Sequence, residues 1–182
     1  EYNHAGFHEG KVQMDVLEEI QNRRTATAFL DKTIPKDTLE RILEAGRLAP
    51  SAKNRQPWRF IVIKKQEHKE KLMESAYCQE NVGQAAVVVA LCTTNIDYKM
   101  PNGQLAHPID LSFACSFMML QAEHEGLGTN VVTTFDEEQI KPVLSVPHSM
   151  RIVMLLLIGY SSVRKENSTR YALKRITSTD HW

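Results

Sequence analysis

The stretch Ala49-Pro50-Ser51-Ala52-Lys53-Asn54-Arg55-Gln56-Pro57-Trp58-Arg59-Phe60 lies between an expected helix and an expected strand. Its two prolines fix φ at two points, and Ser51 and Asn54 supply donors and acceptors that a plain connection would not need. Trp58 stands at the entrance of the strand, where a large aromatic side chain usually packs into the core. By itself the stretch also fits a rigid connecting loop anchored by Trp58.

Apolar residues on both sides of this stretch recur at helical or strand spacing. We expect helices from residue 12 to about 22–24, from 37 to 48, from 66 to 77, from 109 to 125 and from 136 to 144. We expect strands over 59–64, 85–92, 129–135 and 151–159. Asp37 and Asp136 are the expected N-caps of their helices, and Leu48 is expected on an apolar helix face. Gly126-Leu127-Gly128 should end the long helix before it.

The order of these elements does not keep the strict strand-helix alternation of a doubly wound dinucleotide fold. No GxGxxG motif occurs, and Gly126-Leu127-Gly128 ends a helix instead of opening one. We therefore expect one α+β domain over residues 12–160. A flexible leader over 1–11 should precede it, and a polar tail over 161–182 should follow.

The composition is that of an ordinary globular domain. Of the 182 residues, 42% are hydrophobic and 24% are charged, with 22 basic side chains balancing 22 acidic ones. This balance provides no long-range field that favours nucleic acid or an anionic membrane. The longest apolar run, Ile152–Ile158, is far too short to span a bilayer, and the polar N-terminus lacks the apolar region of a signal peptide. We expect a cytoplasmic protein.

The cysteines and histidines follow no metal-binding pattern. Cys78, Cys92 and Cys115 have no CxxC spacing, and no cysteine or carboxylate completes a ligand set for the histidines. We expect three buried thiols in a reducing compartment and no metal site.

A basic cluster follows the first expected helix. Asn22-Arg23-Arg24-Thr25 places two guanidinium groups and a hydroxyl within four residues. Such a cluster can make several charge-assisted hydrogen bonds to a phosphate. The alternative is a solvated helix end at which the arginines neutralise the last carbonyls.

The two stretches together resemble the nitroreductase family. Its first motif has two basic residues, a serine or threonine, another basic residue two positions later and then a phenylalanine; the chain has Arg23-Arg24-Thr25-Ala26-Thr27-Ala28-Phe29. The second motif, Ala-Pro-Ser-Ser-x-Asn-x-Gln-Pro-Trp, is matched except for Ala52 at its second serine. Both motifs occur at the family's spacing, and the order of elements follows the family from about Val12 to Ile176.

The resemblance implies a central mixed, largely antiparallel sheet flanked by helices, in an intertwined homodimer that shares its FMN sites between subunits. Near the phosphate and ribityl chain it places Arg23, Arg24 and Thr25. From the other subunit, Pro50, Ser51 and Asn54 would reach the same flavin.

Further residues would complete the site by the same resemblance. In the tail, Thr169-Arg170-Tyr171-Ala172-Leu173 resembles the family's closing motif, so Arg170 would bind the phosphate. Gln79 falls near the position that meets the pyrimidine edge of the flavin. The backbone N–H groups of Thr133 and Thr134 would face flavin N5 and O4.

Three positions depart from the family pattern. Thr27 replaces the usual lysine or arginine beside flavin N1 and O2, and this loss should make reduction harder by about 1–3 kcal/mol. Thr133 and Thr134 replace a glycine-containing sequence, so their side chains could narrow the substrate cavity. Ser168 stands where a basic residue is frequent.

The resemblance further implies an oxidoreductase that passes hydride from NADH or NADPH through flavin N5 to a nitroaromatic, quinone or similar small-molecule acceptor by a ping-pong mechanism. The cofactor would carry out the chemistry, which explains why no acid-base triad is visible. One alternative is a flavin-binding sensor or carrier without turnover, which Thr27 makes conceivable. The other is a reductive dehalogenase-like relative, although the segment 95–107 is short for a large lid.

Overall fold

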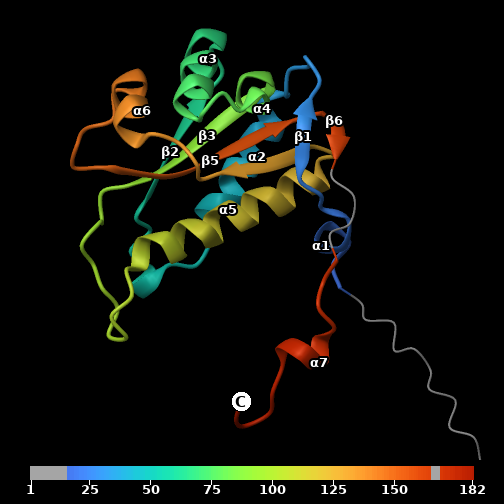
Figure 1. Ribbon diagram of the computed structural model, residues 1–182, viewed down its shortest axis with the longest axis vertical. Helices are drawn as coiled ribbons and strands as arrows, with labels where there is room; N and C mark the ends of the chain where they lie inside the picture. Colours follow the sequence, from blue (N-terminus) through green and yellow to red (C-terminus); the bar gives the residue numbers. More distant parts are fainter. Residues whose placement is uncertain (1–15, 165–168) are drawn as a thin grey trace, which may run out of the picture.

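The computed structural model describes residues 16–164 and 169–182 (Figure 1). The helices are α1 (Glu18–Asn22), α2 (Lys36–Arg47), α3 (Gln66–Ser75), α4 (Glu80–Gln84), α5 (Ala106–His124), α6 (Glu137–Leu144) and α7 (Leu173–Ile176). The strands are β1 (Ala26–Phe29), β2 (Trp58–Ile63), β3 (Val87–Thr93), β4 (Gly128–Val132), β5 (Arg151–Gly159) and β6 (Ser161–Arg164). A 3₁₀ turn, η1 (Ala52–Asn54), lies between α2 and β2. None of the described helices has the length and apolar character needed to cross a membrane.

The central sheet has four strands in the order β2-β3-β5-β4, and each neighbouring pair is antiparallel. β1 and β6 form a separate antiparallel pair. Thr25, just before β1, joins the start of β4 through a parallel bridge to Thr129. The predicted α+β fold with a largely antiparallel sheet is confirmed, and among the described residues the parallel pairing is confined to the Thr25–Thr129 bridge. β2 and β4 are the two edges of the central sheet.

Helices cover both faces of this sheet (Figure 1). Successive side chains of a strand point to opposite faces, so β3 divides its residues between two layers of the core. Val87, Val89 and Leu91 pack in the layer that contains α2 and α5, whereas Val88 and Ala90 pack in the layer that contains α3, α4 and α6. Because neither face meets water, β3 and β5 are apolar along almost their whole length.

α5 crosses one face of the sheet and packs against α2 (Figure 1). Gly46 of α2 permits this approach, because a Cβ there would clash with the side chain of Met118. The helix ends where the glycines predicted it would. Gly126 adopts a φ of 74°, and the N–H of Leu127 donates back to the Ala122 carbonyl.

Most of the predicted elements are confirmed. β5 occupies the predicted residues, and Asp136 caps α6 by accepting hydrogen bonds from the backbone N–H groups of Glu138 and Gln139. Trp58 is buried with an exposure of 6% and packs in the α2–α5 layer, as an aromatic anchor should.

Two expectations for α2 were wrong. Asp37 is not the N-cap, which is Pro35; it lies in the first turn and its carboxylate pairs with Arg41 at 3.0 Å. Leu48 is not on the apolar face, because the helix ends at Arg47 and leaves Leu48 61% exposed.

The expectation of three buried thiols was wrong for Cys78, which is exposed. Cys92 and Cys115 are buried, and burial raises the pKa of both thiols to about 12. These two groups therefore remain protonated and act as small apolar side chains.

Five short elements of the described chain were not predicted: β1, η1, α4, β6 and α7. β6 begins the segment expected to be only a polar tail, and it pairs with β1 across the length of the chain, with Ala26 opposite Arg164. The expected leader, the start of the first helix before residue 16, and Ser168 lie outside the described residues.

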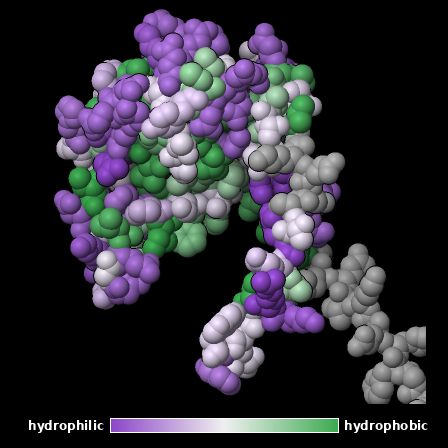
Figure 2. Space-filling view, viewed as in Figure 1, coloured by the Kyte–Doolittle hydropathy of each residue, from purple (hydrophilic) through white to green (hydrophobic). Residues whose placement is uncertain are grey.

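The tail extends away from the body of the chain (Figure 1). All residues from 169 to 182 are exposed, including four large apolar ones, Tyr171, Leu173, Ile176 and Trp182. Phe113 and Phe117 on α5 are also exposed. Figure 2 shows apolar side chains over the middle of one face, at the level of α5 and the sheet.

Candidate functional site

The predicted flavin residues fall into separate groups on the fold. One group lies between α1 and β1, a second lies between the end of β4 and the end of α3, and a third forms the connection from α2 to β2. Arg170 lies apart from these groups in the tail. The contacts of each group determine what it can bind.

The basic group begins where α1 ends. One guanidinium nitrogen of Arg24, Nη1, donates to the carbonyls of Gln21 at 2.6 Å and Arg23 at 2.9 Å. This side chain therefore neutralises the helix end, as the alternative interpretation of the cluster predicted. The half-buried Arg23 guanidinium makes no hydrogen bond or ion pair to another described residue. Arg23 is thus the better placed of the two to receive an anion.

The second group is held together by Gln79. Its side-chain Nε2 donates to the carbonyls of Ala76 at 3.0 Å and Thr134 at 3.1 Å. Both amide hydrogens are thereby used, and Oε1 is left as the acceptor that can meet a ligand. Thr133 and Thr134 themselves are exposed.

β4 connects the basic group to the Gln79 group. Thr25 is bridged to Thr129 on this edge strand, and Thr133 follows four residues later, about 13 Å further along an extended chain. The arrangement thus offers cations near one end of an edge strand and polar backbone groups beyond its other end.

Thr27 lies within β1, next to the basic group. Its hydroxyl Oγ1 donates to the Val163 carbonyl in β6 at 3.3 Å, and the residue is half-buried. The position at which the resemblance leads one to expect a cation therefore carries a neutral side chain directed to the neighbouring strand.

The third group is a tight turn, residues 50–57, which we call the elbow. Ser51 Oγ accepts the backbone N–H of Gln56 at 2.9 Å, and the Ser51 carbonyl accepts the N–H of Asn54 at 2.9 Å. The Asn54 side-chain carbonyl accepts a further bond from Gln56 Nε2 at 3.2 Å. The hydroxyl hydrogen of Ser51 takes no part in its bond to Gln56 and remains a donor.

The elbow adopts a strained backbone conformation. Lys53, Asn54 and Gln56 have φ values of 54°, 52° and 49°, which fall in the left-handed region. This region costs a non-glycine residue about 1–2 kcal/mol. Strain of this kind persists only where surrounding contacts fix the backbone, and it is concentrated at functional sites.

Two contacts from outside fix the elbow. The backbone N–H of Ala52 donates to Asp110 Oδ1 at 2.8 Å, and Asp110 is a 2% exposed residue near the start of α5. The Arg55 guanidinium stacks on the ring of Tyr98, 3.7 Å from its centroid, in the segment before α5. Neither Asp110 nor Tyr98 was singled out from the sequence. A carboxylate on the same helical face as Ala114 and Met118 was a signal that could have identified Asp110.

The elbow and the basic group lie at opposite ends of α5. The elbow contacts Asp110, whereas α1, which leads into the basic group, contacts the other end through Glu19 and His124, whose Oε1 and Nδ1 are 2.8 Å apart. Asp110 and His124 are 14 residues apart, or about 21 Å along a helix. One chain therefore does not bring its own elbow and its own basic group onto one small ligand ring.

His107 lies one turn before Asp110 on α5 and is 8% exposed. Burial and the nearby Arg151 lower its pKa, against opposing effects of Asp110 and Asp97. Its Nδ1 and the second Asp110 oxygen, Oδ2, are buried and have no hydrogen-bond partner among the described residues.

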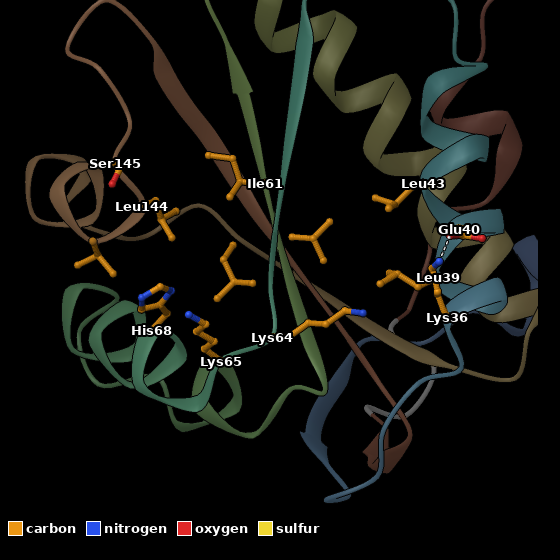
Figure 3. Close-up of a pocket in the computed structure, with 13 residues that line it drawn as sticks. Lys36, Leu39, Glu40, Leu43, Ile61, Lys64, Lys65, His68, Leu144 and Ser145 are labelled. Atoms are coloured by element: carbon orange, nitrogen blue, oxygen red, sulfur yellow. Dashed lines mark ion pairs between the residues drawn. The ribbon is translucent and has the colours of Figure 1, made fainter.

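A cleft lies elsewhere on the described part of the molecule. It has a volume of about 670 Å³ and is lined by residues of α2, β2, α3 and α6 (Figure 3). At its mouth Lys36 pairs with Glu40 at 3.5 Å. None of the predicted site residues lines this cleft, so its size does not identify it as the flavin site.

Comparison with known proteins gives consistent matches. A model of the nitroreductase family matches residues 20–81 and 72–160. A Methanothermobacter thermautotrophicus protein with the provisional name NADH dehydrogenase/NAD(P)H nitroreductase is 32% identical over 157 residues, which cover 84% of this chain and 81% of that protein. FMN reductase (NAD(P)H) of Bacillus subtilis is 26% identical over 173 residues, covering 86% of this chain and 70% of that protein.

Two further matches concern a more distant enzyme and a solved structure. Iodotyrosine deiodinase 1 of Mus musculus is 22% identical over 194 residues, covering 88% of this chain and 68% of that protein. The crystal structure of a nitroreductase family protein from Clostridium difficile matches with a TM-score of 0.82 and 31% identity, covering 93% of this chain and all of that one.

The family model extends over both diagnostic motifs and most of the described chain, and the fold matches that of a solved member over nearly its whole length. The chain therefore belongs to the nitroreductase family.

Proposed function

We propose that two copies of this chain bind FMN between them and use it to pass hydride from NADH or NADPH to a nitroaromatic, quinone or similar acceptor. The observation that carries this proposal is the placement of the two diagnostic motifs at opposite ends of α5. A site built from both motifs requires the elbow of one copy and the basic group of another.

The residues of the β4 side fit the chemistry of FMN. FMN is elongated, with an anionic phosphate at one end and a ring that carries hydrogen-bond donors and acceptors at the other. Arg23 would bind the phosphate, supported by the remaining donors of Arg24 and by the hydroxyl of Thr25. Gln79 Oε1 would accept from the N3–H of the ring, because both hydrogens of its amide are already used.

Thr133 and Thr134 would contribute backbone N–H groups beside flavin N5 and O4. Their exposed side chains would form part of the wall that the acceptor meets. The elbow of the partner copy would close the opposite side through Pro50, Ser51 and Asn54.

Bound FMN would supply the redox chemistry, since N5 of a flavin accepts hydride from a nicotinamide and returns it to an acceptor. The protein's contribution is to hold the ring, to exclude water from it and to admit the two substrates in turn. Use of the same space by both substrates gives ping-pong kinetics.

Exposed apolar surface supports the homodimer. Phe113 and Phe117 on α5 and the apolar residues of the tail are uncovered in one chain. A second copy would cover them, and the tail would then bring Arg170 toward a phosphate site. Arg170 already takes part in an interaction, so a contact with phosphate would be additional to it.

The test is an absorption spectrum of the purified protein with and without added FMN, followed by anaerobic titration with NADH and NADPH. We expect one FMN per chain, bleaching by at least one nicotinamide, and a dimer by light scattering. Protein that stays colourless in excess FMN contradicts cofactor binding. A monomer that holds FMN tightly contradicts the shared site.

A second candidate function, reductive dehalogenation, is supported by the match to iodotyrosine deiodinase. The segment between β3 and α5 would have to cover the substrate, but it closes early, with Lys99 bridged to Leu105 and Met100 N–H bonded to the Gln104 carbonyl at 2.8 Å. Iodide release from a halotyrosine at a rate above that of quinone reduction would favour this alternative. Bound FMN without turnover on any acceptor would favour a flavin sensor or carrier.

A further inference from the structure

We propose that Asp110 is a positioning residue that holds the elbow in the conformation required to contact flavin in the neighbouring copy. The inference rests on the proposed function, because the elbow is the segment expected to meet the ligand. It goes beyond that function by assigning a role to a buried carboxylate that lies outside both motifs.

The elbow cannot maintain its own shape through intrinsic preference. Three of its residues, Lys53, Asn54 and Gln56, occupy the left-handed region without being glycine. Its internal hydrogen bonds join Ser51 to Asn54 and Gln56, and so they close the turn but do not fix it to the rest of the protein. An external anchor is needed to fix its position.

Asp110 supplies this anchor from a rigid support. It lies in the second turn of the 19-residue helix α5, and its Oδ1 accepts the Ala52 N–H at 2.8 Å. A carboxylate makes a stronger acceptor than a neutral group, and the 2% exposure of Asp110 limits competition from water. Ala52 lies between Ser51 and Asn54 in the elbow, so a bond that fixes Ala52 also orients these two predicted ligand contacts.

The charge of Asp110 is itself unusual at this place. Burying a carboxylate beside an apolar core is unfavourable unless hydrogen bonds compensate, yet Oδ2 has no partner among the described residues. The bond from Ala52 N–H to Oδ1 is therefore the contact through which Asp110 acts on the elbow, and an amide oxygen can also accept that bond. The geometry therefore assigns the essential role to Oδ1 as an acceptor, and this assignment makes Asp110→Asn the conservative variant.

The experiment compares Asp110→Ala, Asp110→Asn and the matched control Cys115→Ala with the wild type. Cys115 lies on the same helix, is 2% exposed, and packs in the α2–α5 layer of the core without a hydrogen bond to Ala52. Cys115→Ala therefore shows how far a loss of packing in α5 alone changes the measured quantities, because the hydrogen bond from Ala52 to Asp110 stays in place. Three quantities are measured on the full chain: hydrogen exchange of peptides spanning residues 49–57, the Kd for FMN from quenching of flavin fluorescence, and the unfolding midpoint.

We expect Asp110→Ala to speed exchange in the elbow and to raise the Kd for FMN at least tenfold. In Asp110→Asn, the exchange rate of the elbow and the Kd for FMN should both stay within about twofold of wild type, because the Asn carbonyl can still accept the hydrogen bond from Ala52 N–H. Cys115→Ala should lower the unfolding midpoint while leaving elbow exchange and Kd unchanged.

The inference is overturned if hydrogen exchange in the elbow is no faster in Asp110→Ala than in Cys115→Ala. It is also overturned if the two variants lower the unfolding midpoint equally and raise the Kd for FMN by the same factor. Should Asp110→Ala fail to fold, Asp110→Leu, which fills similar space without an acceptor, takes its place, and elbow exchange no faster than in Cys115→Ala again overturns the inference. If the wild type binds no FMN, the proposed function fails, and the exchange measurement alone decides whether Asp110 anchors the elbow.

Discussion

The side-chain amide of Gln79 donates to the carbonyl of Thr134 at 3.1 Å and so joins the end of α3 to the segment that follows β4. The same nitrogen also donates to Ala76 at 3.0 Å, within its own turn. The amide is therefore oriented before any ligand arrives, and its oxygen is the group left to bind. Two residues 55 positions apart in sequence form one surface in this way.

We predict that Gln79→Glu weakens FMN binding more than Gln79→Ala does. A carboxylate of the same shape cannot donate to the two carbonyls and would repel both of them, whereas alanine only removes the contacts. The Kd for FMN, measured by fluorescence quenching, should rise about tenfold for alanine and further for glutamate. Gln139→Ala, which loses a bond to Asp136 Oδ2 at 2.8 Å on the exposed side of α6, serves as the control. Equal affinities in all four proteins would show that Gln79 does not face the flavin.

The core of the fold could be predicted from the sequence because its signals are long and local. β3 and β5 are continuous apolar runs, α5 carries an apolar stripe ended by Gly126, and Asp136 lies directly before α6. β1 and β6 could not be found this way. They have four residues each, and their stability comes from pairing between residues as distant as Ala26 and Arg164.

The site was predictable in composition but not in arrangement. The motifs around Arg23 and Ser51 identified the family through a resemblance, yet spacing along the chain does not reveal that α5 holds them at opposite ends. Nor does it reveal that the side chain of Arg24 is hydrogen-bonded to the end of α1 while the side chain of Arg23 is not. Such details depend on side-chain directions that packing determines.

Arg23→Ala should weaken FMN binding about 10- to 100-fold, the value of a charged hydrogen bond to phosphate. Riboflavin lacks the phosphate, so its Kd should not change. This difference between the two ligands separates loss of a phosphate contact from general damage to the site. Arg47→Ala, which removes an exposed ion pair with Glu44 at 2.6 Å, should change neither Kd. A parallel loss of FMN and riboflavin affinity in Arg23→Ala would contradict the phosphate assignment.

Acid should weaken the connection between α2 and the end of α5. Arg41 holds Glu125 through Nε to Oε1 at 2.6 Å and Nη2 to Oε2 at 2.8 Å, and this hydrogen-bonded pairing lowers the pKa of Glu125 to about 2. A carboxylate whose pKa is lowered in the folded state contributes its full stabilisation at pH values above its ordinary pKa of 4.5. That stabilisation is lost progressively as pH falls from about 4.5 toward about 2.

The measurement is the urea midpoint of unfolding between pH 2 and pH 7. Glu125→Gln should be less stable than wild type at pH 7, and the difference should shrink as the pH falls through this window. Glu44→Gln removes a more exposed ion pair with Arg47, so its difference in urea midpoint from wild type should change less with pH. A constant difference between wild type and Glu125→Gln at every pH would refute the role of this ion pair.

The substitution of Thr27 for a basic residue should be visible in the redox potential of the bound cofactor. Reduction places negative charge on the N1 and O2 side of a flavin, and a neutral residue there offers no ionic compensation. Thr27→Lys should therefore raise the two-electron midpoint potential by about 20–65 mV, the equivalent of about 1–3 kcal/mol. Thr27→Val removes the bond from the hydroxyl to Val163 without adding charge, so it should leave the potential nearly unchanged. If Thr27→Lys binds FMN normally and its potential equals that of the wild type, Thr27 does not lie beside the ring and its neutrality has no part in tuning the reaction.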